Sequence, residues 1–203
     1  MAQAKRLNGG PSRPADLRKL YMFKHVEDNL LEEIYPLLQR SHWRRRTEIR
    51  LRKEFHDQVG FVWSGRFRFA ATRPQGEVVS LYSIASGESF GFATALARYR
   101  YGEVHRLLVD EDGIILALAA DRFRALQERS QAFSLALTRA LNILALDYGA
   151  RVYELAVSDV RTRLVAALLR RADLQNPSRD RVLLSPTPTH IDLAAEIGAS
   201  REG

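Results

Sequence analysis

The side chains best suited to chemistry are scattered and do not form a catalytic arrangement. His42, His56 and His105 have no paired spacing, whereas a cupin-like metalloenzyme needs a cluster of histidine and carboxylate ligands on neighbouring strands. There is no nucleophile motif and no glycine-rich phosphate loop that leads into a helix. The sequence has no cysteine, which excludes disulfides, cysteine-ligated zinc or iron–sulfur clusters, and a cysteine nucleophile. We therefore predict no catalytic residues, no metal site and no enzyme.

Charge is the first indication of a partner. The net charge is +7 and the sequence pI is about 10.0, which favours polyanions because neutralised phosphates release counterions. The run Arg44–Arg46 could contact phosphates, or it could be the solvated face of a strand. The first twenty residues have no apolar signal-peptide core, and the longest apolar run, Ile114–Ala120, is too short for a bilayer. We expect a cytoplasmic protein without a membrane partner.

The segment 189–202, THIDLAAEIGASRE, has the pattern of a helix-turn-helix. Thr189 and Asp192 resemble a capping box at the start of a helix. Gly198 suits the tight turn between two helices, and Ser200 would cap a second helix. An ordinary helix hairpin is the alternative interpretation of the same residues.

These residues need a scaffold, and its central element is a helix predicted over 131–157, which contains no proline. Apolar or small residues recur at spacings of 4, 3, 4 and 3, which is typical of a helix that faces a partner helix: Leu141, Ala145, Tyr148, Val152 and Leu155. At about 1.5 Å per residue the helix is roughly 40 Å long, more than a small domain needs for its own core. It could be a long core helix of one domain, or a dimerisation helix that links two domains.

Short strands rich in β-branched and aromatic residues precede this helix, and turn signals separate them. They are expected at 59–65, 66–72, 78–84, 89–92, 104–110 and 113–120, with a further strand around Ile49 and Leu51. Helices are expected at 26–38, 123–127 and 160–174, and Ser130 should cap the long helix. The fold class is α+β, with a flexible tail at 1–20, an antiparallel β-roll within 21–130, the long helix, and a C-terminal domain over 158–203.

Four motifs in this order are similar to those of the bacterial Crp/Fnr superfamily of transcription regulators: VWSGRF at 62–67, SGESFGF at 86–92, SDVRTRL at 158–164, and the segment 189–202. The resemblance covers the chain from about residue 20 to its end. It implies a cyclic-nucleotide-binding-like β-roll as sensor domain, a dimerisation helix, and a winged helix-turn-helix that is incomplete here. It also implies a homodimer, double-stranded DNA and RNA polymerase as partners.

The resemblance places DNA contacts at Thr189, His190, Ser200, Arg201 and Glu202. Arg201 and Glu202 match the base-reading pair of the family's second helix. An arginine can donate two hydrogen bonds to guanine, and a glutamate can accept one from cytosine. A solvent-exposed helix cap is the alternative.

The resemblance also implies an effector pocket near Gly87, Glu88, Phe90, Gly91, Phe92 and Tyr148. Cyclic-AMP-binding members have a glutamate where Phe92 stands, and an arginine–serine pair near Glu103-Val104. Because Glu103 would repel a phosphate, we do not expect cyclic AMP to bind. An iron–sulfur cluster is excluded without cysteine. Haem would need one or two axial ligands from His25, His42, His56 or His105, and lone histidines discriminate poorly. The cofactor stays open.

The sequence stops at Gly203, a few residues into the predicted second helix. It is either the ordered part of a longer chain or a truncated form. We predict a homodimeric, sequence-specific transcription regulator. The alternative is a β-roll protein that binds a ligand or another protein and has a vestigial C-terminus. The sequence does not identify the effector, the regulated genes, or whether the protein activates or represses.

Overall fold

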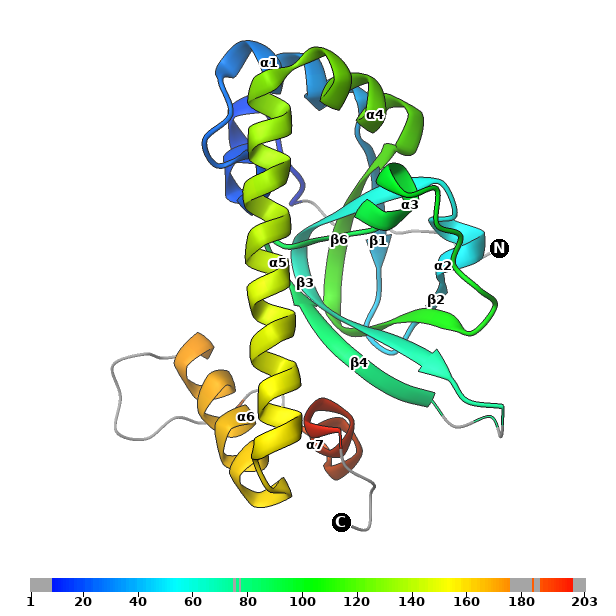
Figure 1. Cartoon of the computed structure of the whole chain (residues 1–203), viewed down its shortest axis with the longest axis vertical. Coiled ribbons are helices and arrows are strands. Elements are labelled where there is room, and N and C mark those ends of the chain that lie inside the picture. The colour runs from blue at the N-terminus through cyan, green and yellow to red at the C-terminus, as the bar shows by residue number, and fades with distance from the viewer. Residues whose placement is uncertain (1–8, 75, 77, 176–183, 185–186, 199–203) are drawn as a thin grey trace.

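The computed structural model describes residues 9–74, 76, 78–175, 184 and 187–198. The sensor half is a curled antiparallel sheet beside a long helix, α5 (Gln131–Val157), and the C-terminal helices lie at the far end of α5 (Figure 1). This α+β arrangement is the predicted one.

The sheet has the strand order β1-β6-β3-β4, with β2 paired to β6 and β5 paired to β3, and every pair is antiparallel. The strands are β1 (Gln39–Trp43), β2 (Glu48–Arg50), β3 (Gln58–Thr72), β4 (Val78–Ala85), β5 (Ser89–Phe90) and β6 (His105–Ala119). Because β3 and β6 are each 15 residues long, their pairing forms the spine of the roll.

Two predicted turns are bends inside these long strands, so the four strands predicted at 59–72 and 104–120 are two. Gly65 has φ +88°, and a Cβ placed there would lie 2.7 Å from Cα of Gly113 on the paired strand. The register shifts on both sides of Ser64. Such irregularities increase local bending, so the glycines let β3 and β6 cross closely and curl the sheet.

Short helices close the ends of the roll. They are the 3-10 helices η1 (Pro14–Lys19), η2 (Tyr21–Phe23) and η3 (Tyr35–Leu37), and the α-helices α1 (Asp28–Ile34), α2 (Leu51–Glu54), α3 (Phe92–Leu96) and α4 (Ala120–Arg129). Leu51 was expected in a strand but begins α2, with its side chain fully buried in the roll. The predicted cap of α5 is confirmed: the hydroxyl oxygen of Ser130 accepts a hydrogen bond from the Phe133 N–H at 3.2 Å.

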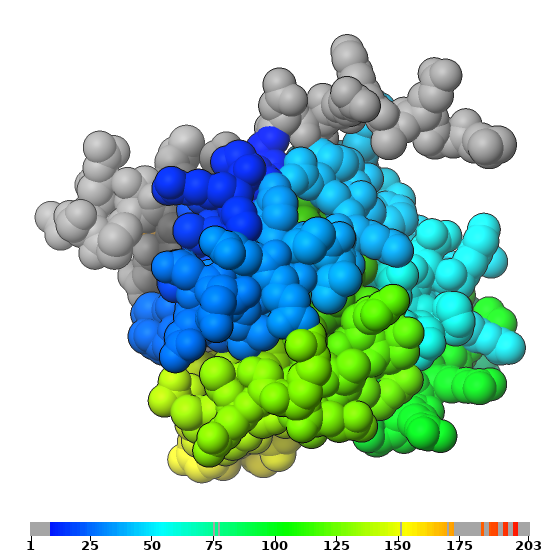
Figure 2. All heavy atoms as spheres, turned by 90° about the horizontal axis from the view of Figure 1, so that it is seen from above, coloured from blue at the N-terminus to red at the C-terminus, as the bar shows by residue number. Residues whose placement is uncertain are grey.

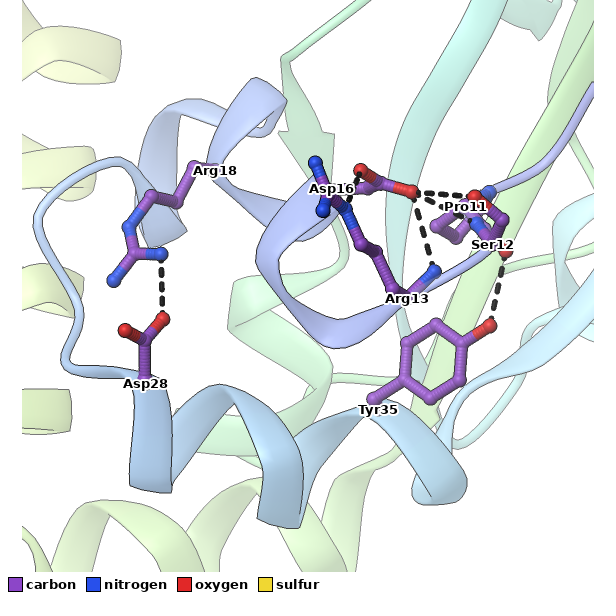
Figure 3. Close-up of polar contacts among 7 residues, drawn as sticks. All are labelled: Pro11, Ser12, Arg13, Asp16, Arg18, Asp28 and Tyr35. Atoms are coloured by element: carbon purple, nitrogen blue, oxygen red, sulfur yellow. Dashed lines mark hydrogen bonds and ion pairs between the residues drawn. The ribbon is translucent and has the colours of Figure 1, made fainter.

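The expectation of a flexible tail over 1–20 is wrong for the described residues 9–20. Leu17 and Leu20 are fully buried, and Tyr35 Oη donates a hydrogen bond to the Pro11 carbonyl at 3.0 Å (Figure 3). Two hydrogen bonds from Ser12, one from its N–H and one from its hydroxyl, lower the pKa of Asp16 to about 2. Figure 2 shows the chain's first elements lying against α4 at this end of the molecule, where Arg129 pairs with Glu33.

Two hydrophobic cores result. One lies between the sheet and the helices, and it gathers residues from η1, η2, α1, α4 and the first turns of α5, including Phe23, Phe61, Phe123 and Phe133. The other fills the inside of the roll with side chains such as Phe55, Phe67, Phe69 and Leu107. The first core therefore fixes the start of α5 to the sensor.

Beyond α5 the chain forms α6 (Val160–Gln175) and α7 (His190–Ile197). Asp159 caps α6 by accepting the Thr162 N–H at 2.7 Å. Arg163 ties the two helices together, since its Nε donates to the Ile197 carbonyl at 2.9 Å. The side chain of Ala167 is fully buried in α6, and α7 contacts both α6 and β4.

Candidate effector pocket and dimerisation helix

A cavity of about 440 Å³ lies between α5 and the sheet, within the range of small-molecule sites. Tyr21 and Met22 close one side, β4 and the residues after it form another, and α5 supplies the third. Of the six residues that the sequence places in an effector pocket, Glu88, Phe92 and Tyr148 line this cavity. The cavity therefore joins residues from the start, the middle and the end of the sensor half.

The other three, Gly87, Phe90 and Gly91, are not among the lining residues. They pack against other parts of the sensor instead. Gly87 has φ +94°, and a Cβ there would meet the ring of Tyr21 at 2.8 Å. Gly91 has φ +87° and packs on the Gln58 carbonyl. Phe90 is 3% exposed in the core of the roll and meets Phe55 edge-on. These residues shape the loop that carries Glu88.

Glu88 stands at the wall of the cavity, and its Oε2 accepts the Ala85 N–H at 2.7 Å. Burial raises the pKa of this carboxyl, and the nearby charge of Asp147 on α5 raises it further. Asp147 also lines the cavity. Two carboxyl groups from different elements thus face the same space.

An aromatic cluster extends from the cavity wall into the roll. Phe69 of β3 stacks on Tyr82 of β4 with ring centroids 4.9 Å apart, and Tyr82 in turn meets Tyr148 of α5 at 5.1 Å. Tyr101 and His105 contact Phe69 from the other side. Burial raises the pKa of Tyr101 to about 12, and the pKa of Tyr82 rises for the same reason. We name Phe69, Tyr82, Tyr101, His105 and Tyr148 the aromatic cluster.

Sequence reasoning included Tyr148 but missed the other four members. Phe69, Tyr82 and Tyr101 come from different segments of the sequence, and only the pairing of β3 with β4 and β6 brings them together. The signal in the sequence was an unusual concentration of tyrosines, with Tyr82, Tyr99 and Tyr101 within twenty residues. His105 is held in place because its Nδ1 accepts the Gly102 N–H at 3.0 Å.

Of the groups considered for phosphate or haem, only His105 belongs to the aromatic cluster, and none is among the residues that line the cavity. Glu103 pairs with Arg52 at 2.8 Å on the surface. His25 and His56 are exposed, and His42 lies on β1. Within the described residues, no group of three or more histidine, cysteine or carboxylate side chains could hold a metal ion. Arg44–Arg46 are exposed in the connection between β1 and β2.

The residues of α5 divide into two faces. Leu141 and Leu144 pack on the core, and Tyr148 contacts Tyr82. The other face is apolar and exposed: Leu146 is 74% exposed and Tyr153 is 66% exposed. Of the five residues predicted at a dimer seam, Ala145, Val152 and Leu155 are exposed. Leu141 packs against the core, and Tyr148 contacts Tyr82 but is still 37% exposed.

The residues expected to contact DNA are described only in part. Thr189 and His190 are exposed at the start of α7. Ser200, Arg201 and Glu202 lie outside the described residues. Gly198 has φ +67°, as the predicted turn requires, and a Cβ there would meet Leu155 of α5 at 3.0 Å. No described helix has the length and apolarity needed to cross a membrane.

Comparison with solved structures connects this geometry to known proteins. The c-di-GMP-responsive global regulator CLP of Xanthomonas campestris is 20% identical, with a TM-score of 0.60 and 87% of each chain covered. The catabolite activator protein of Thermus thermophilus is 23% identical, with a TM-score of 0.53, covering 89% of this chain and 81% of that one.

A putative transcriptional regulator of the Crp/Fnr family from Eubacterium rectale has a TM-score of 0.67 at 13% identity, covering 91% of this chain and 83% of that one. No family profile matches the sequence, and no functionally curated protein matches it. The chain thus shares the fold of the Crp/Fnr regulators, and the fold predicted from the motifs is confirmed.

Proposed function

We propose that this chain is a member of the Crp/Fnr superfamily and acts as a homodimeric, sequence-specific transcription regulator. The observation that carries the proposal is the uncovered apolar face of α5, within a fold shared with such regulators. Its β-roll would sense an effector other than cyclic AMP.

The exposed face of α5 supports dimerisation. Leu146, Tyr153 and Val157 are 74%, 66% and 63% exposed, and they lie at helical spacing with Gly149 and Ala150 between them. Burying the three large apolar side chains would stabilise a dimer by about 1.5–3 kcal/mol each. Small residues between them let two helices approach closely. We propose that a second copy of α5 packs here, with Ala145 and Val152 at the edge of the contact.

The fixed attachments at the two ends of α5 support regulation. Phe133 is fully buried in the sensor core at one end, and Leu155 contacts Gly198 of the turn after α7 at the other. A change in the pocket beside Tyr148 would therefore act on a helix that also positions α6 and α7. A ligand that binds one arrangement better than another would shift their populations.

The chemistry of the pocket argues against cyclic AMP. The lining has three acidic residues, Glu88, Asp147 and Glu154, against two arginines, Arg66 and Arg171, so a phosphate would meet an excess of carboxylates. Burying an anion beside carboxylates is costly.

The test uses a chain that continues through the second helix of the helix-turn-helix. Its affinity is measured for a palindromic promoter fragment and for a scrambled fragment of equal length at one salt concentration. We expect clear preference for the palindrome, and Arg201→Ala should relax preference at one guanine by ~1–3 kcal/mol. Equal affinity for both fragments would contradict sequence reading and favour a β-roll protein that acts through ligand or protein contacts.

A second measurement addresses the dimer. Leu146→Glu places a charge on the proposed contact, whereas Val104→Glu places one on an apolar side chain that is 44% exposed elsewhere on the sensor. Sedimentation equilibrium should show a dimer for the unchanged chain and for Val104→Glu, and a monomer for Leu146→Glu. A monomeric unchanged chain would refute the proposed assembly.

A further inference from the structure

The charges around the cavity beside α5 do not balance. Its lining includes three acidic residues, Glu88, Asp147 and Glu154, and two arginines, Arg66 and Arg171. Arg66 directs its Nε toward Glu111, at 3.4 Å, and Glu111 is not part of the lining. The positive charge that could offset the carboxylates is therefore partly engaged outside the cavity.

Among the described residues, two of the carboxylates are not held by a salt bridge, although the positive charge of Arg66 acts against the rise in the pKa of Glu88. In the described part of the chain, no salt bridge includes Glu88 or Asp147, and Glu88 receives one backbone hydrogen bond, from Ala85. The two groups come from different elements, Glu88 from the loop before β5 and Asp147 from α5. Glu88 is half-buried and Asp147 is exposed. Two carboxylates that repel each other are stabilised when a cation is placed between them.

The remaining walls are aromatic and apolar. Tyr82 and Tyr148 form an edge-to-face pair, and Tyr21, Phe92 and Leu144 also line the cavity. Aromatic faces attract cations and also pack against flat apolar groups. These walls suit a ligand that combines a positive charge with an aromatic or apolar group.

We infer that the cavity binds a small organic cation, an amine carried on an aromatic or apolar body. The ammonium group lies between Glu88 and Asp147 and donates hydrogen bonds to both. The body packs against Tyr82 and Tyr148, so the ligand bridges the roll and α5. This inference rests on the proposed function in one respect, that the cavity is the effector site of the sensor.

The test compares three indole compounds of similar size and different charge. Isothermal titration calorimetry on the full chain, without DNA, measures binding of tryptamine, which is cationic, of tryptophol, which is neutral, and of indole-3-acetate, which is anionic. We expect saturable binding of tryptamine, at least about tenfold weaker binding of tryptophol, and none of indole-3-acetate. Equal binding of the cation and the anion, or no binding of tryptamine, would overturn the inference.

Matched variants locate the site. Glu88→Gln and Asp147→Asn should each weaken tryptamine binding about tenfold or more, because each removes one charge-assisted contact. Glu128→Gln removes an exposed carboxylate on α4 and should leave binding unchanged. Circular dichroism first establishes that each variant is folded. If Glu88→Gln and Asp147→Asn both bind tryptamine as tightly as the unchanged chain, the amine does not bind where we place it.

The DNA measurement separates this inference from the proposed function. If the chain binds tryptamine at these carboxylates but has no preference for any DNA sequence, the cation site is supported and the assignment as a sequence-specific regulator is wrong. A chain that prefers a palindrome but ignores all three indoles retains the regulator assignment and loses the cation site.

Discussion

The two halves of α5 differ in what covers them. In the first half, Phe133, Ala136 and Leu137 are at most 8% exposed, and they pack with Phe23 and Phe123 in the core of the sensor. In the second half, Leu146, Tyr153 and Val157 are all more than 60% exposed. One continuous helix therefore contributes to the subunit's own stability at its start, and it offers an uncovered apolar face toward its end.

The sharpest test of this difference is a pair of truncations in the first half. Phe133→Ala should lower the free energy of unfolding by ~3–5 kcal/mol, because it leaves a cavity beside the rings of Phe23 and Phe123. Leu135→Ala, two residues along and 49% exposed, should change it by about 0.5 kcal/mol or less. Urea unfolding followed by circular dichroism measures both. Similar losses in the two variants would show that Phe133 contributes no more to the core than the exposed Leu135 does.

The next prediction concerns the second half of α5, where a substitution should weaken dimerisation and leave the subunit folded. Tyr153→Glu should weaken the dimer by roughly 2–3 kcal/mol, because an exposed aromatic at a helix contact is replaced by a charge. The dimer dissociation constant is measured by sedimentation equilibrium, with Val104→Glu as the control. If Tyr153→Glu unfolds the chain instead of separating it, the second half belongs to the subunit's own core.

A smaller change in stability at Gly149 shows whether this glycine only weakens the helix or also lets two copies of α5 approach closely. A Cβ at Gly149 would meet nothing within 4 Å in the subunit, so Gly149→Ala should stabilise the helix by ~0.5–1 kcal/mol. Ala156→Gly, an exposed position in the same half, should cost a similar amount. Thermal unfolding measures the two changes. A Gly149→Ala variant that is more stable but dimerises less would place Gly149 at the closest approach of two helices.

The smallest expected effect is at the cavity between the sensor and α5, where Glu88→Gln should change how stability depends on pH. Because burial raises its folded-state pKa, Glu88 contributes most favourably at low pH, where it is protonated in both states. That contribution is lost as pH rises through the folded-state pKa. Glu88→Gln should therefore be more stable than the unchanged chain at pH 7, and the difference should vanish near pH 4. Melting temperatures across this range measure it, and a constant difference would contradict the assigned cause.

The bounds of α5 were predictable to the residue because Ser130 caps one end, Ser158-Asp159 follows the other, and no proline intervenes. Its orientation was not. A spacing of 4 and 3 can be found on either face of a helix that is apolar on both, so periodicity does not show which face the subunit covers. Leu141 and Tyr148 fit the predicted seam by spacing and also contact their own sensor, so their place at a dimer seam stays a prediction.

Other errors have similar physical causes. Gly65 and Gly113 signalled turns, yet the strands continue because the two glycines permit a close crossing of paired strands. The segment 9–20 has prolines and glycines, and its helix is too short to show a period, so its burial was not visible. Half of the predicted effector residues line the cavity, and the aromatic cluster depends on a strand pairing that sequence alone does not give.

The packing of the first residues has a consequence for synthesis on the ribosome. Phe23 contacts Phe133, and Tyr21 closes a cavity whose opposite wall is Tyr148, so each partner is translated more than a hundred residues later. The contacts of Tyr21 and Phe23 with α5 can therefore form only after that helix has left the exit tunnel.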